Sequence, residues 1–159
     1  MQSGCVRRRS RVGQEAAMST ERFYRAVMDA SEDRRREAVK RATSAVFHAL
    51  RDRLTPEEAD QVAAQLPREL KLIWWAGEEP GRRPVKMRRD AFYRRVANEA
   101  GLASVRDARW MTLAVFAALK QQLTPGEAED VLAQLPKDLK EVWVEAEPAG
   151  PPAAERAAR

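Results

Sequence analysis

Two glutamates at equivalent positions of a repeated segment are the first candidates for chemistry in this sequence. Glu58 follows the dipeptide Thr55-Pro56, and Glu127 follows a second Thr-Pro dipeptide at the same spacing. Paired glutamates hold metal ions in some helical bundles, but those sites add a Glu-x-x-His pattern that is missing here. Thr-Pro-x-Glu is instead typical of a helix start, where the glutamate reaches back to the threonine N–H. We therefore expect two capping boxes, and neither a metal site nor a catalytic pair.

Two glutamines and one histidine are the remaining polar candidates. Gln65 and Gln134 each precede a Leu-Pro break, so we expect them to bond backbone groups freed at that break, with ligand binding as the alternative. His48 is the only histidine, and its counterpart in the repeat is Ala117. A catalytic or metal role common to both copies is therefore excluded, and we expect a solvated side chain. It shares that polar side of its helix with Arg41, Ser44, Arg51 and Asp52.

The usual signatures of catalysis and cofactor binding are missing from the sequence. It contains no nucleophile elbow, no Gly-rich phosphate loop and no His-Glu-x-x-His. Cys5 is the only cysteine, which excludes a disulfide framework or a cysteine zinc site within one chain. We expect no enzyme, no cofactor and no small-molecule substrate.

The four tryptophans divide into a repeated pair and an unrepeated pair. Trp74 and Trp143 are equivalent and fall on the apolar side of the last helix of each copy, which favours core packing. The counterparts of Trp75 and Trp110 are not aromatic. An aromatic residue that is used once is less constrained by the common core, so Trp75 and Trp110 are the candidate contacts for a protein partner.

All these residues are placed by a stretch that occurs twice. Residues 45–74 and 114–143 share Ala-Val-Phe, Leu-Thr-Pro, Gln-Leu-Pro and Trp in one constant register, and Phe-Tyr-Arg recurs upstream of both. The composition favours helices throughout. One such copy would bury too little surface to be stable alone. We predict an all-α fold: a tandem repeat of two four-helix units, 18–79 and 91–147, packed as one pseudo-twofold helical domain.

Local signals predict where the helices lie. In the first unit we expect a helix over 21–30, a long helix that starts with Ser31 as its cap and runs to about Leu54, and two short helices opened by Pro56 and Pro67. In the second unit Gly101 ends the first helix, and a long helix follows over about 104–122.

Three further segments lack helical patterning. Residues 1–17 are basic and unpatterned, and the more natural start is Met18; residues 148–159 are rich in Pro and Ala, so we expect disorder in both. Residues 80–90 form a basic Pro/Gly linker. Most of the formal net charge of +5 lies in these segments. The candidate nucleic-acid contacts in the linker are Arg82, Arg83, Lys86, Arg88 and Arg89.

The repeated motifs resemble a known bacterial family. A long helix ending in Ala-Val-x-x-Leu leads into Leu-Thr-Pro-x-Glu-Ala, then Ala-Gln-Leu-Pro and Leu-Lys. This pattern, over about residues 22–143, resembles the family catalogued as domain of unknown function 2267. The resemblance implies a small all-helical protein of the bacterial cytosol, and it supplies no catalytic residue.

These observations favour a non-catalytic interaction or adaptor protein that binds a protein partner or forms a homodimer. The alternative is a nucleic-acid-associated protein that uses the basic linker and the N-terminal segment, but a duplex binder needs a basic face, and each unit is slightly acidic outside the linker. No apolar run is long enough to span a membrane, and no signal peptide pattern follows the first arginines, so we expect a cytoplasmic protein.

Overall fold

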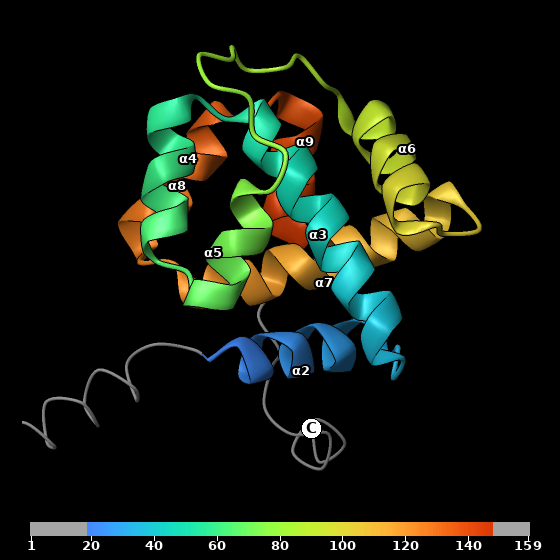
Figure 1. The fold of residues 1–159 in the computed structure, drawn as a ribbon. Coiled ribbons are helices and arrows are strands. Elements are labelled where there is room, and N and C mark those ends of the chain that lie inside the picture. Colours follow the sequence, from blue (N-terminus) through green and yellow to red (C-terminus); the bar gives the residue numbers. More distant parts are fainter. Residues whose placement is uncertain (1–18, 148–159) are drawn as a thin grey trace, which may run out of the picture.

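The computed structural model describes residues 19–147, which form eight α-helices and contain no strand (Figure 1). The predicted helical class is therefore confirmed. The predictions for residues 1–17 and for the tail 148–159 lie outside the described residues. The helices are α2 (Thr20–Ser31), α3 (Arg36–Arg53), α4 (Pro56–Ala64), α5 (Arg68–Trp75), α6 (Arg89–Ala100), α7 (Val105–Gln122), α8 (Pro125–Gln134) and α9 (Lys137–Glu145).

Serine residues cap two of the four longer helices. The Ser19 hydroxyl caps α2 by accepting from the Arg22 N–H, and Ser104 caps α7 in the same way. Gly101 ends α6 in the left-handed conformation, with a φ of 67° that glycine adopts without steric cost. The predicted linker 80–90 is shortened at its end, because α6 already begins at Arg89.

The start of α3 differs from the prediction. Ser31 is the last residue of α2, not the cap of the next helix, and its hydroxyl accepts from the Asp33 N–H. The Asp33 carboxylate in turn accepts from the Arg35 N–H and guanidinium. These local bonds hold a short turn, so α3 begins only at Arg36.

The first helix of each half packs mainly against the long helix of the other half. The most extensive helix contacts join α2 to α7 and α3 to α6, and the two long helices α3 and α7 also pack together. Figure 1 shows α2 lying below both long helices and α6 beside α3. The two halves therefore share one core.

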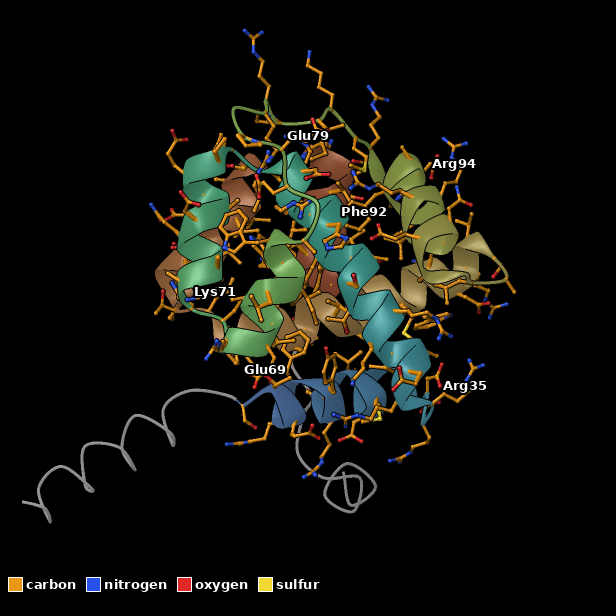
Figure 2. All side chains as sticks on the ribbon, in the orientation of Figure 1. Arg35, Glu69, Lys71, Glu79, Phe92 and Arg94 are labelled. Carbon is orange, nitrogen blue, oxygen red and sulfur yellow. The ribbon has the colours of Figure 1, made fainter. Side chains whose placement is uncertain are left out.

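Two aromatic rows fill this core at equivalent positions. Phe23, Phe47 and Trp74 pack edge to face, with ring centroids 5.6 and 5.4 Å apart. The second row is Phe92, Phe116 and Trp143, with centroids 5.8 and 5.0 Å apart, and Figure 2 marks Phe92 where α6 faces α3. All six rings are buried, so the core role predicted for Trp74 and Trp143 is confirmed. Edge-to-face packing orients each ring as well as burying it.

Within residues 19–147, no helix combines the length and the apolar character needed to cross a membrane.

Candidate functional site

Each half of the chain caps a helix of the other half with a glutamine. The Thr55 N–H at the start of α4 donates to Gln134 Oε1 at 2.9 Å, and the Thr124 N–H at the start of α8 donates to Gln65 Oε1 at 2.8 Å. The prediction that these amides bond backbone groups is confirmed, but the predicted place is wrong. The bonded groups belong to the opposite half, because α4 and α8 pack side by side.

The predicted capping boxes are only half formed. The hydroxyl of Thr55 accepts from the Glu58 N–H at 3.3 Å, and Thr124 accepts from the Glu127 N–H at the same distance. The returning bond from the glutamate carboxylate is missing, because a glutamine of the other half already bonds each threonine N–H. This part of the prediction is wrong, and both carboxylates are left for other contacts.

The two freed carboxylates meet at the contact of α4 with α8. Glu58 is 7% exposed and Glu127 is 8% exposed. Oxygens of Glu58, Glu127 and the exposed Asp130 all lie within 4.8 Å of one another. The Oε1 atoms of both glutamates are buried and have no hydrogen-bond partner among the described residues. We call Glu58, Glu127 and Asp130 the carboxylate cluster.

The environment of the cluster favours an uncharged Glu58. Burial, followed by the adjacent carboxyl group of Glu127 and then the charge of Asp130, raises the pKa of Glu58 to about 8. Two carboxyl groups this close can share one proton or can share a bound cation. Asp130 was not predicted as a site residue, since its counterpart in the first half is Gln61 and no repeated pattern points to it.

Basic residues at equivalent positions end the last helix of each half. Arg51 is 3% exposed, and its Nη1 donates to the carbonyls of Trp74 and Ala76 at 2.7 Å each. At the equivalent position, Lys120 Nζ donates to the carbonyls of Trp143 and Ala146. The prediction that Arg51 lies on a solvated side is therefore wrong. A basic residue at the same place in both copies was the signal that could have identified this role.

His48 is also an internal residue, contrary to the prediction of a solvated side chain. Its side chain is 14% exposed. Nδ1 faces Glu99 Oε1 on α6, and Nε2 lies 2.8 Å from the Ile73 carbonyl on α5. Both ring nitrogens therefore have oxygen partners, and His48 connects three helices.

The basic linker residues are not equivalent to one another. The Arg82 guanidinium donates to the carbonyls of Leu54 and Arg51 at 2.8 Å each and pairs with Glu78, so it terminates α3. The Arg89 N–H donates to Asp138, and its guanidinium is half-buried. Arg83, Lys86 and Arg88 are exposed. Of the five candidate nucleic-acid contacts, only these three belong to the exposed residues.

The two unrepeated tryptophans also differ. Trp75 is partly buried against the core, whereas Trp110 on α7 is 50% exposed. Trp110 borders a hollow of about 340 Å³, and the Arg109 guanidinium lies 5.6 Å from the centre of its ring. Arg35, which Figure 2 labels near the start of α3, is one of the residues that line this hollow. Its lining residues include Asp33, Arg35, Ala103, Asp107 and Met111.

The described residues thus form an all-helical protein with a buried carboxylate cluster and one exposed tryptophan beside a hollow. The family model "Uncharacterized conserved protein (DUF2267)" matches residues 20–142, so the chain belongs to this family. The resemblance drawn from its motifs is confirmed. No curated protein matches the chain.

Proposed function

We propose that the chain is a non-catalytic interaction module of the bacterial cytosol that binds a partner protein through the surface around Trp110. The supporting observation is the pairing of this half-exposed aromatic ring with a hollow next to it. Large aromatic side chains beside a pocket are the usual anchors of protein interfaces. We call this surface the Trp110 hollow.

The Trp110 hollow has a restrained aromatic ring and an exposed acidic residue, and both features suit the binding of a partner protein. The Arg109 guanidinium lies against the tryptophan ring and also pairs with Glu145 on α9 at 2.7 Å, which limits the motion of the ring. Restricting an anchor before binding reduces the entropy lost on binding. Asp33 is paired with Arg35, whereas the neighbouring Asp107 lies exposed at the edge of the hollow. The expected partner surface presents an apolar side chain flanked by a basic group.

We further propose that the chain is built as two four-helix units about an approximate twofold axis. The reciprocal bonds of Gln65 and Gln134 and the two matching aromatic rows support this arrangement. Trp110 departs from that symmetry because its counterpart is Arg41. A single binding surface per chain follows from this difference.

Site-specific photo-crosslinking in the native cell tests the proposed interaction. A photoreactive residue replaces the exposed Ala103, which lines the hollow, and a control places it at Leu72, which is 65% exposed on α5. We expect one discrete adduct from position 103 and none of that mass from position 72. Trp110→Ala should abolish the adduct while leaving the circular dichroism spectrum unchanged.

Two results would contradict the proposal. The first is an adduct at position 103 that survives Trp110→Ala, because the tryptophan would then not be the anchor. The second is the lack of any adduct other than a crosslink between two copies of the chain. In that case size-exclusion chromatography with light scattering should find a dimer, and the surface would serve self-association.

A further inference from the structure

The carboxylate cluster has the donor set and the spacing of a cation site. Glu58 comes from α4, and Glu127 and Asp130 come from adjacent turns of α8. Their oxygens lie within 4.8 Å of one another. Two ligands on opposite sides of a calcium ion are at most roughly 5 Å apart, since each oxygen lies about 2.3–2.6 Å from the metal. The three carboxylates could therefore contact one ion without a change of backbone.

The buried oxygens of the cluster provide a separate observation. Glu58 Oε1 and Glu127 Oε1 are each enclosed by protein and have no hydrogen-bond partner within residues 19–147. Buried polar groups are normally paired, so such atoms indicate a missing partner. The two side chains that lie with Glu58 in the cluster, Glu127 and Asp130, are both acidic. The missing partner should therefore carry positive charge.

The surrounding bonds hold the two glutamates in place. Glu58 and Glu127 lie in the first turns of their helices, where Thr55 and Thr124 accept from their N–H groups. Gln134 and Gln65 then fasten each helix start to the opposite half. The positive ends of the two helix dipoles favour the nearby carboxylates. They do not provide an atom that pairs with the buried oxygens. A site built on fixed helix starts loses little entropy when an ion binds.

From this geometry we propose that the carboxylate cluster binds one divalent cation of the oxygen-preferring kind, such as Ca²⁺, Mn²⁺ or Mg²⁺. Glu58 and Glu127 supply the buried ligands, and the exposed Asp130 supplies the ligand nearest to solvent. Water completes the coordination on the Asp130 side. An all-carboxylate set suits these hard cations better than Zn²⁺, which prefers nitrogen and sulfur ligands. The bound ion would connect the first half of the chain to the second.

Titration of the full chain with Mn²⁺, followed by electron paramagnetic resonance of the free ion, tests this proposal. The metal-stripped protein is buffered at about pH 8.5, because carboxylate ligands must be deprotonated to bind. We expect saturation at one Mn²⁺ per chain and competition by Ca²⁺. Asp130→Asn removes one of the three charged ligands and should weaken Mn²⁺ binding by at least the roughly tenfold that the loss of an outer-shell partner costs. Glu129→Gln, on the same helix but outside the cluster, should leave it unchanged.

Two variants distinguish a loss of metal binding from a loss of the fold. Asp130 is exposed, so Asp130→Asn should retain the melting temperature of the metal-free chain. Glu127→Gln keeps the shape of the buried side chain and should abolish binding, with circular dichroism checking that the helices remain. Equal Mn²⁺ affinity for Asp130→Asn and Glu129→Gln would overturn the proposal, because the bound ions would then sit elsewhere on the acidic surface. Failure of the unaltered chain to bind Mn²⁺ at millimolar concentration would overturn it as well.

Discussion

The two halves of the chain agree at some equivalent positions and differ at others. Arg51 and Lys120 are different residues with the same structural role. Each donates to two carbonyls at the end of the last helix of its half. Gln65 and Gln134 likewise perform one task in both directions. Equivalent positions that keep their contacts therefore hold the helices together.

Two positions whose counterpart in the other half is a different kind of residue lie where the chain could bind an ion or a partner protein. Asp130 completes the carboxylate cluster, and its counterpart is Gln61. Trp110 borders the hollow, and its counterpart is Arg41. His48 is the exception, because it has no equivalent and still connects helices within the chain. Loss of symmetry marks candidate function only where the side chain also reaches the surface.

The largest expected effect comes from removing a helix-terminating cation. Arg51→Ala should destabilise the fold by about 3–5 kcal/mol, because it leaves the carbonyls of Trp74 and Ala76 without this donor and takes one of two arginine partners from Asp52. Lys120→Ala should cost less, about 1–3 kcal/mol, since its side chain is less buried. Urea denaturation of both variants measures the difference. If Lys120→Ala lost as much stability as Arg51→Ala or more, burial of the basic side chain would not determine the size of the effect.

A pH titration of stability examines the carboxylate cluster. The pKa of Glu58 rises from its ordinary value of 4.5 to about 8 in the folded chain. Between these values the folded chain keeps a proton that the unfolded chain releases, so this group stabilises the fold below about pH 4.5 and loses that contribution as the pH rises to about 8. Glu58→Gln should therefore be more stable than the unaltered chain at about pH 8.5, by a few kcal/mol, since one pKa unit corresponds to about 1.4 kcal/mol.

The measurement is urea denaturation at several pH values with a chelator present. Near pH 4.5 the unaltered chain and Glu58→Gln should be nearly equal in stability. Glu57→Gln, a change of the exposed neighbour, is the control and should follow the unaltered chain at every pH. Parallel profiles for the unaltered chain and Glu58→Gln would mean that Glu58 is ionised in the fold.

The reciprocal glutamine bonds should give smaller and nearly matched effects. Gln134→Ala should destabilise the fold by about 1–2 kcal/mol, because it removes bonds to both the N–H and the hydroxyl of Thr55. Gln65→Ala removes one side-chain bond and should cost about 1 kcal/mol. Calorimetric melting of the two variants gives the comparison. A neutral Gln134→Ala would indicate that water replaces the amide at the start of α4.

The exposed linker should give the smallest effect. Arg88→Ala should change stability by less than about 0.5 kcal/mol, whereas Arg82→Ala should destabilise because its guanidinium terminates α3. At about 150 mM salt we expect only weak, non-specific binding of labelled duplex DNA or single-stranded RNA. Fluorescence anisotropy of the labelled nucleic acid measures this binding. Saturable binding that Arg88→Ala weakens would favour the nucleic-acid hypothesis over the interaction module.

Local patterns predicted much of this fold. Thr55-Pro56 and Thr124-Pro125 start helices where expected, because threonine and proline act within one turn of the chain. The apolar side of the last helix in each half likewise predicted the buried Trp74 and Trp143.

The candidate site depended on contacts that no local pattern contains. Gln134 meets Thr55 across 79 residues, so only the packing of α4 on α8 decides which group caps the helix. That choice displaced Glu58 from the predicted capping box and turned it towards Glu127. His48 and Arg51 were misplaced for a related reason. Their polar heads are buried because α5 and α6 bring acceptors to them, and helical periodicity alone does not reveal an acceptor from another helix.

The exchange of first helices between the halves has a consequence for how the chain folds during synthesis. When α2 to α5 have emerged from the ribosome, α7, the main support of α2, has not yet been made. Phe23 can already contact Phe47 on α3, but the part of α2 that packs on α7 stays uncovered until that helix is made. Contacts between distant segments slow folding and prolong the exposure of apolar surface. An excised first half should therefore remain aggregation-prone, or form a dimer by pairing its exposed faces.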